Sequence, residues 1–224
     1  MSSAVVMTLY LVFEALSTGR VSLDDELTVS PLAASQAPSK LGLAAGQKIR
    51  LDDAMRATAV RSCNDMAMAL AEYVGGSQAR FAAMATQKAQ QLGMTGTRYA
   101  NATGLSDAQH YSTAADLAKL AQAIVRDHPE HYPLYSQREY RYNNITQPNR
   151  NRLLWTDPYV DGMKTGHTET AGWCLIASAK RGERRLVSVV LGAASDTTRA
   201  AESQKLLNFG FQAYDTVQLY QSGR

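Results

Sequence analysis

The chain has 224 residues, 45% of them hydrophobic, so it is long enough to bury a core as one domain, or as one domain with a small appendage. Its 23 Lys plus Arg and 20 Asp plus Glu leave a net charge of +3. This mild, scattered charge argues against a nucleic-acid partner and is compatible with a small anionic ligand. The two cysteines, Cys63 and Cys174, do not make a disulfide framework, and we expect free, buried thiols.

The first predicted element is the apolar run from Ala4 to Leu16, which carries one charge, at Glu14. Its 13 residues fall short of the roughly 20 that a membrane span needs, and the basic residues of a secretory signal do not precede it. We therefore predict a buried helix, with an uncleaved signal as the poorer alternative. Residues 23–38 are expected to form a loop, and residues 38–55 an extended or turn-rich segment that enters a helix near Leu51.

Helical periodicity dominates from Leu51 to about Arg126. Two apolar stripes are predicted, Met66, Leu70 and Tyr73 on the first helix and Phe81, Met84 and Ala85 on the next. Ser112 and Thr113 precede another apolar run and are typical N-cap residues, so we expect a helix that begins there and ends before Pro129.

The last third of the chain changes to a strand period. Residues 173–179 and 185–192 flank the turn KRGER and predict a hairpin. Residues 198–213 return to a helix, whose predicted apolar face carries Leu206, Leu207 and Phe211. Helices in the middle and strands toward the end indicate an α+β fold, an antiparallel sheet with helices packed on it. The sequence has no internal repeat and no obvious linker.

One short motif carries chemistry. Residues 161–170 read DGMKTGHTET, and Lys164-Thr165-Gly166 is one of the motifs with which serine penicillin-recognising enzymes hold a peptide. Alone the tripeptide is weak evidence, because a Lys before a strand is usually a solvated charge. In context, a strand edge with Thr and Gly can pair with an extended peptide while Lys164 supplies positive potential. Gly172 is expected to let another backbone approach closely.

A second motif lies upstream, in VRSCNDMAMALAE, where Ser62 and Asn64 stand at the start of a predicted helix. Both residue types are common N-caps, so helix capping is one interpretation. The other is chemical, since a serine hydroxyl can pass on a proton and an amide can hold a substrate peptide. The presence of Lys164-Thr165-Gly166 downstream favours the chemical interpretation.

Five blocks of the chain resemble, in order, the low-molecular-mass penicillin-binding proteins, the D-alanyl-D-alanine carboxypeptidases of peptidase family S11. They read VRSCNDMAMALAEYVGGSQARF, LGMTGTRYANATGL, YSTAADLAKLAQAIV, NRNRLLW and VDGMKTGHTETAGWCLIASAKRGERRLVSVVLG. The resemblance implies a serine β-lactamase/transpeptidase-like fold, with a five-stranded antiparallel sheet flanked by a mainly helical subdomain. It implies a catalytic domain over residues 1–217, with 218–224 as the start of a linker toward a further β domain.

The family's site residues carry over by position. Ser62 and Asn64 resemble the second motif, and Lys164, Thr165 and Gly166 the third. The implied substrate-binding set also includes His167 and Thr168, which continue the third motif, and Arg150 and Arg199, which resemble cationic positions near the site. A terminal carboxylate needs such donors, although each arginine taken singly also fits a surface or structural role.

The first family motif departs from its usual form, Pro-Ala-Ser-Met-Thr-Lys. Aligning Met7-Thr8 places Ser2 at the nucleophile and Val5 at the lysine, and a shift to Ser3 places Val6 there instead. Valine takes no proton, so we expect low intrinsic activity. The resemblance further implies a chain that is incomplete at its N-terminus, without a signal peptide or the first strands of the sheet. A truncated reading frame and a natural remnant both fit.

The function implied by the resemblance is hydrolysis of peptidoglycan stem peptides that end in D-Ala-D-Ala, through an acyl-enzyme, in the bacterial cell wall. β-Lactams would be inhibitors, the location periplasmic or extracytoplasmic, and membrane association confined to segments outside this chain. The rival is a non-catalytic peptidoglycan- or β-lactam-binding remnant. A β-lactamase is disfavoured, because no segment resembles a Glu-x-x-x-Asn loop.

The chemistry requires no cofactor or metal, and HPEH (His128 to His131) is interpreted as a surface turn.

Overall fold

A computed structural model describes residues 2–215, with side chains from Ala4 onward. The helices are α1 (Ser2–Ser17), α2 (Pro31–Ala34), α3 (Leu51–Arg61), α4 (Asn64–Gly75), α5 (Gln78–Gln91), α6 (Ala114–Asp127), the 3-10 helix η1 (Tyr132–Ser136), α7 (Leu153–Thr156) and α8 (Asp196–Ala213). The strands are β1 (Glu26–Thr28), β2 (Lys48–Arg50), β3 (Glu139–Tyr142), β4 (Ile145–Pro148), β5 (Val160–Thr168), β6 (Gly172–Arg181) and β7 (Arg184–Ala193). The predicted domain end at 217 and the segment 218–224 lie outside the described residues.

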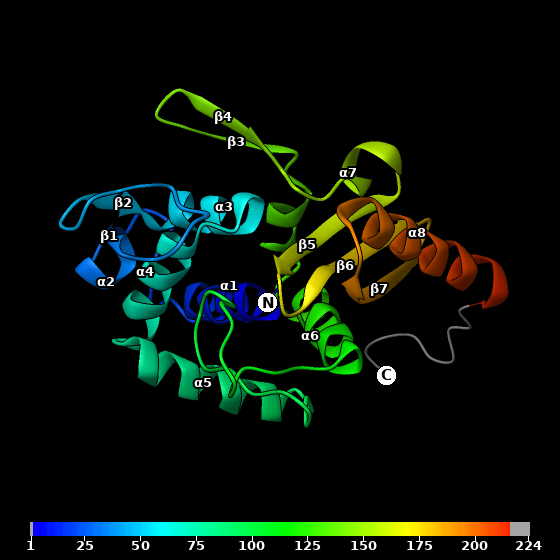
Figure 1. Cartoon of the computed structure of the whole chain (residues 1–224), viewed down its shortest axis with the longest axis horizontal. Helices are drawn as coiled ribbons and strands as arrows, with labels where there is room; N and C mark the ends of the chain where they lie inside the picture. The colour runs from blue at the N-terminus through cyan, green and yellow to red at the C-terminus, as the bar shows by residue number, and fades with distance from the viewer. Residues whose placement is uncertain (1, 216–224) are drawn as a thin grey trace.

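Helix α1 passes through the centre of the molecule (Figure 1). A helix that is apolar nearly all round must be covered on every side, and α1 contacts α3, α4, α5, α6 and the strands β5 and β6. Val6, Met7 and Phe13 have no exposed surface. The predicted buried helix is confirmed, and it is the element that joins the helical part to the sheet.

The helical part begins and ends largely where its signals predict. Helix α3 begins at Leu51, and Thr113 caps α6 by accepting a hydrogen bond from the Asp116 amide. Helix α6 ends at Asp127, before Pro129, as predicted. Tyr73 does not belong to the predicted buried stripe, because it is 41% exposed and its hydroxyl donates to Asp25 at 2.9 Å.

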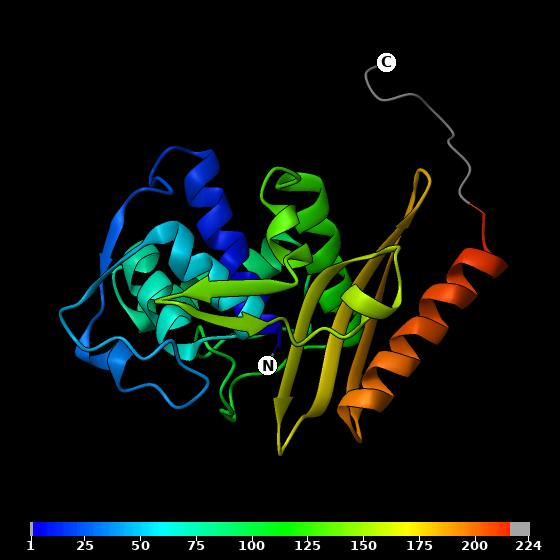
Figure 2. The same cartoon turned by 90° about the horizontal axis from the view of Figure 1, so that it is seen from above.

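The main sheet is antiparallel, with the strand order β5-β6-β7. The predicted hairpin is confirmed as β6 and β7, and residues 2–215 contribute three strands to this sheet where the resemblance implies five. Helices α1 and α6 lie on one face and α8 on the other (Figure 2). Successive side chains of β6 point to opposite faces of the sheet. Ile176 joins the core around α1, whereas Leu175 and Ala177 face the smaller core beneath α8. Gly172 allows the predicted close approach, because a Cβ there would lie 3.1 Å from the Ala193 carbonyl oxygen.

Some local predictions are wrong. Strand β1 and helix α2 lie in the predicted loop, where Ser30 caps α2 and Pro31 occupies its first turn. Leu206 is 49% exposed while Leu207 is buried, because adjacent residues on a helix point about 100° apart. The β3-β4 ribbon was not predicted, since strands of four residues depend on their pairing more than on any local pattern.

These elements form an α+β architecture with a mainly helical subdomain, as predicted. Within residues 2–215, no helix combines the length and apolar character that crossing a membrane requires.

Candidate active site

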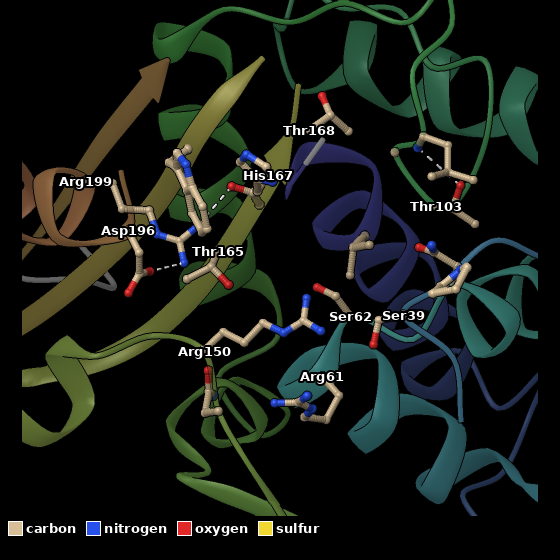
Figure 3. A pocket seen from close by; sticks show the side chains of 18 of the residues that line it. Ser39, Arg61, Ser62, Thr103, Arg150, Thr165, His167, Thr168, Asp196 and Arg199 are labelled. Carbon is tan, nitrogen blue, oxygen red and sulfur yellow. Dashed lines mark hydrogen bonds and ion pairs between the residues drawn. The ribbon is translucent and has the colours of Figure 1, made fainter. Parts of the chain in front are cut away.

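A cavity of about 710 Å³ opens between the edge of β5 and the junction of α3 with α4 (Figure 3). Strand β5 is the edge strand of the sheet, so the side of it that does not pair with β6 is available to the cavity. The predicted site residues that line the cavity are Ser62, Asn64, Arg150, Thr165, Gly166, His167, Thr168 and Arg199. Elements far apart in the sequence therefore bring the two motifs to one place.

Ser62 lies at the sharp junction of two helices. It is the C-cap of α3, with φ 56° and ψ 41°, a left-handed conformation that costs a non-glycine residue about 1–3 kcal/mol. The N-cap position of α4 is Cys63, which makes no side-chain capping bond. The interpretation of Ser62 as an N-cap is therefore wrong, and its hydroxyl is directed into the cavity (Figure 3).

Asn64 begins α4 and fixes one wall of the cavity. Its backbone amide donates to the Ser39 carbonyl at 2.7 Å, and its side-chain Nδ2 donates to the Ala37 carbonyl at 2.8 Å. Asn64 lines the cavity, so its Oδ1 and the second hydrogen of Nδ2 are left to meet a ligand. Next to it, Asp65 is fully buried and accepts from the Leu41 and Gly42 amides, which holds the same loop.

The buried Lys164 of β5 contacts Ser62, which lines the cavity. The two residues are 102 positions apart, yet Lys164 Nζ donates to Ser62 Oγ and also to the Thr165 carbonyl at 3.2 Å. Only 2% of Lys164 is exposed. Burial, followed by the charges of Arg150 and Arg199, lowers its pKa to about 7. A large fraction of this amine is therefore neutral near pH 7, and a neutral amine can accept a proton.

Arg199 of α8 lines the cavity and forms hydrogen bonds to strands β5 and β6. Its Nη1 donates to the Gly166 carbonyl at 3.0 Å and the Cys174 carbonyl at 3.3 Å, and its Nη2 pairs with Asp196 at 2.5 Å. The residue is 3% exposed, and its guanidinium lies 4.9 Å from the ring centre of Trp173. These contacts fix the segment of β5 that follows the buried lysine.

The residues that continue the third motif, His167 and Thr168, lie in the upper part of Figure 3, above Thr165. Thr165 is buried and lines the cavity, whereas His167 is exposed and its ring lies 4.0 Å from that of Trp173. The Thr168 hydroxyl bonds that of Thr170 at 3.1 Å. Arg150 reaches into the cavity beside Ser62 (Figure 3).

The first motif is described only in part. Ser2 begins α1, but its side chain and that of Ser3 lie outside the described residues. Val5, which the resemblance aligns with the family lysine, is 3% exposed and lines the cavity. An apolar side chain thus occupies the wall where the resemblance implies an amine.

Sequence reasoning missed several residues of the cavity wall, among them Ser39, Arg61, Thr103 and Leu105. They stand on loops or at a helix end with no chemical pattern of their own. Thr103 is placed by a local turn, in which Asn101 Oδ1 accepts from the Gly104 amide at 2.7 Å. The block LGMTGTRYANATGL contains this turn, but its letters alone do not show that it faces Ser62.

The segment HPEH forms the predicted surface turn, in which the His131 amide donates to the His128 carbonyl at 3.1 Å and Pro129 and Glu130 are exposed, but its two imidazole rings point inward. His128 is 4% exposed, and the ring of His131 lies 5.1 Å from that of Phe13, so both pack on α1. The apolar surface of α1 draws them inward. Within residues 2–215, no group of three or more potential metal ligands comes together.

Comparison with known proteins agrees with this geometry. The family profile of D-alanyl-D-alanine carboxypeptidases, peptidase S11, matches residues 2–195. The D-alanyl-D-alanine carboxypeptidase DacC of Escherichia coli is 42% identical over 219 residues, which are 95% of this chain and 55% of that protein. The chain spans between 55% and 58% of the length of the first curated relatives that it matches.

Two solved structures extend the comparison. Penicillin-binding protein 6B from Escherichia coli matches with a TM-score of 0.92 and 39% identity, over 100% of this chain and 73% of its own. Penicillin-binding protein D2 from Listeria monocytogenes, in a cefotaxime-bound form, matches with a TM-score of 0.84 and 30% identity, over 94% of this chain and 86% of its own. The cavity with its two motifs, the profile match and these likenesses agree, and the chain belongs to the peptidase S11 family of D-alanyl-D-alanine carboxypeptidases.

Proposed function

We propose that the chain carries the acyl-transfer site of a serine-type D-alanyl-D-alanine carboxypeptidase that acts on peptidoglycan stem peptides. The observation that carries the proposal is the contact of Ser62 with the buried amine of Lys164, in a cavity bordered by an open strand edge. In this reaction a serine attacks the penultimate D-Ala carbonyl, the terminal D-Ala leaves with a proton, and water then hydrolyses the acyl-enzyme. β-Lactams would acylate the same serine.

The substrate peptide is expected to lie along β5. An extended peptide adds to an exposed sheet edge through main-chain hydrogen bonds, here along residues 166–168, while Asn64 lies in the cavity lining contributed by α4. Thr165 and the arginines of the cavity would meet its terminal carboxylate. The edge explains affinity for an extended chain, and the cations explain a preference for a free C-terminus.

Proton transfer in this chain is assigned to Ser62 and Lys164. Ser2 stands at the nucleophile position by register, and Ser62 would relay its proton to the neutral amine of Lys164. Val5 offers no base beside the nucleophile. Since general-base assistance is typically worth 10² to 10⁴ in rate, we expect acylation to be slow by at least about a hundredfold.

Intact-mass spectrometry after incubation with a penicillin tests the proposal. We expect little adduct on the unaltered chain and faster adduct formation in Val5→Lys, because that amine would enter the cavity wall. Val5→Met is the matched control, since it adds length without a base. A stoichiometric adduct on Ser2 or Ser3 of the unaltered chain would overturn the assigned impairment.

The second candidate function, a binding protein without catalysis, is favoured by Val5 alone. It retains the cavity and the strand edge but releases no D-Ala. Calorimetric titration with an N-acetylated peptide ending in D-Ala-D-Ala, together with an assay for free D-Ala, separates the two. Peptide binding without release of D-Ala in every variant, Val5→Lys included, would favour the binding protein. Absence of peptide binding would exclude both candidate functions.

The assignments to residues 1–217 as one catalytic domain and to an extracytoplasmic location belong to the same proposal. They rest on the family match over residues 2–195. Location of a tagged chain by cell fractionation tests the second of them.

A further inference from the structure

A second cavity lies outside the candidate active site, between α5 and the segment 95–111 that follows it. We call it the α5 groove. Its volume is about 770 Å³, within the range of about 300–1,000 Å³ that is typical of small-molecule sites. The same segment lines both cavities, with residues 103–105 in the active site and residues on either side of them in the α5 groove. The groove is therefore separated from the active site by a single shared wall.

Hydrogen bonds fix the walls of the α5 groove in place. The Thr86 hydroxyl on α5 donates to the Tyr99 carbonyl at 3.3 Å and accepts from the Tyr99 amide at 3.1 Å. Across the segment, the Arg98 amide donates to the Tyr111 carbonyl at 2.9 Å and the Tyr111 amide to the Arg98 carbonyl at 3.1 Å. A ligand would therefore meet a preformed surface, on which Arg98 and Tyr111 stand opposite each other.

The polar side chains of the groove are exposed and unused. Within residues 2–215 they make no side-chain hydrogen bond and no ion pair, and they are Gln87, Gln90, Thr95, Arg98 and Gln109. A primary amide offers two donor hydrogens and an acceptor oxygen. The groove thus presents donors and acceptors in similar numbers.

The charge of the α5 groove differs from that of the active site. Its charged lining residues are Arg98 and Asp107, which balance, whereas the active-site cavity has four arginines and one aspartate. A neutral ligand is therefore favoured over an anion. Tyr111 is 55% exposed, and its ring offers an apolar face beside the amides. A pyranose sugar has the matching surface, with C–H groups on its face and hydroxyl groups around its rim.

The proposed path of the peptide leads toward the shared wall. Figure 3 places Thr103 and Thr168 on the opposite side of Ser62 from Arg150. If the terminal carboxylate lies toward the arginines, the preceding residues of the peptide leave past Thr103, which belongs to the segment 95–111. The end of a stem peptide that is attached to a sugar chain would then emerge beside the α5 groove.

We propose that the α5 groove binds a neutral saccharide of N-acetylated amino sugars, the class of sugar chain that carries stem peptides. The amides of Gln87 and Gln90 would bond its hydroxyl and N-acetyl groups, and the Tyr111 ring would pack on a sugar face. The inference rests on the proposed function for the identity of the sugar, because it names a further part of the same substrate.

Titration with chitotetraose, an N-acetylglucosamine oligomer, tests the inference through backbone amide shifts in ¹H–¹⁵N spectra. The chains are the unaltered one, Tyr111→Ala and Gln87→Ala. Gln91→Ala and Tyr159→Ala are the matched controls, because Gln91 ends the same helix, Tyr159 is 49% exposed, and both lie outside the groove lining. Calorimetry with the N-acetylated peptide ending in D-Ala-D-Ala is run in parallel on each chain.

We expect saturable shifts on α5 and in residues 95–111, and an affinity that falls about threefold to tenfold in Tyr111→Ala and in Gln87→Ala. Both controls should bind the saccharide as the unaltered chain does, and peptide affinity should be the same in all five chains.

Absence of a saturable shift, shifts confined to β5 and the region of Ser62, or an equal loss in the controls would overturn the inference. Shifts in the α5 groove with the peptide but not with chitotetraose would also overturn it, and would assign the groove to the peptide. Saccharide binding without any peptide binding would overturn the proposed function and leave the groove as a saccharide site.

Discussion

At the scale of single residues, the buried amine of Lys164 dominates the energetics of the site. A charged ammonium loses its hydration when buried, and here two arginines add repulsion, so the neutral form is favoured. The same pKa of about 7 that suits proton transfer lowers the stability of the folded chain at neutral pH. Function and stability therefore oppose each other at this position.

Lys164→Met should stabilise the chain by a few kcal/mol at pH 7, at about 1.36 kcal/mol for each pKa unit. The unfolded lysine titrates near 10.5 and the folded one near 7, so between these values the unfolded chain binds more protons. Stability of the unaltered chain should accordingly rise with pH through this window, and the gain in Lys164→Met should shrink toward pH 10. Urea unfolding at both pH values measures it. Lys48→Met, at an exposed position, is the control, and an equal gain at both pH values would contradict the pKa assignment.

The cysteines should resist reagents in the folded chain. Cys63 and Cys174 are both buried and free, as predicted, and burial together with Asp65 raises the pKa of Cys63 to about 12. The thiolate is the reactive form of a cysteine, and almost none of Cys63 is thiolate at pH 8. Thiol titration should find two thiols per chain after denaturation without reductant, and slow reaction before it. Finding none in the denatured chain would indicate a disulfide.

At the scale of elements, β5 is positioned by close packing at its start. A Cβ on Gly162 would lie 2.5 Å from the Tyr132 hydroxyl, which itself donates to Asp161 at 2.8 Å. Gly162→Ala should therefore destabilise the chain by about 1–3 kcal/mol. It should also weaken peptide binding, because Lys164 follows two residues later on the strand.

The matched background for this prediction is Tyr132→Phe, which removes the clashing oxygen. In a double-mutant cycle of urea unfolding free energies, Gly162→Ala should cost less in the Tyr132→Phe chain than in the unaltered one. Additive costs would show that the hydroxyl is not the obstacle.

Helix α8 offers a matched pair of leucines. Leu207 is 1% exposed in the smaller core, whereas its neighbour Leu206 is 49% exposed. Leu207→Ala should cost about 2–4 kcal/mol and Leu206→Ala less than about 0.5 kcal/mol in unfolding free energy. Denaturant titration of both variants checks this, and similar losses would mean that α8 packs through a different face.

At the scale of the whole molecule, the helical subdomain and the sheet share one core. Met163 and Ile176 from the sheet belong to the same cluster as Val5, Met7 and Phe13 from α1. The cavity lies where these two parts meet, so its geometry depends on both. A ligand that spans the cavity should stabilise the entire fold by mass action.

We therefore expect one cooperative thermal transition, with equal calorimetric and van't Hoff enthalpies, that moves to higher temperature with a peptide ending in D-Ala-D-Ala. Differential scanning calorimetry with and without peptide measures both properties. Two separate transitions would show that the subdomains fold independently in spite of the shared core.

The sequence by itself determined the elements with strong periodicity and clear end signals. The all-round apolar run at residues 4–16, the capped helix after Thr113 and the hairpin around KRGER are local patterns, and each is confirmed. The sequence also determined the family, because several motifs stand in order along the chain. It could not determine β1, β3 or β4, since strands of three or four residues are fixed by partners that are distant in sequence.

Only the tertiary structure decided which residues meet. The motifs assign Ser62 and Lys164 to one site, but the hydrogen bond between them, the exposure of Leu206 and the buried Arg61 Nε, which has no partner among the described residues, have no signature in the letters around them. The reason is physical. Burial, pKa and hydrogen-bond satisfaction depend on atoms from elements as far apart as α3, β5 and α8, and these come together only when the helices close over the two faces of the sheet.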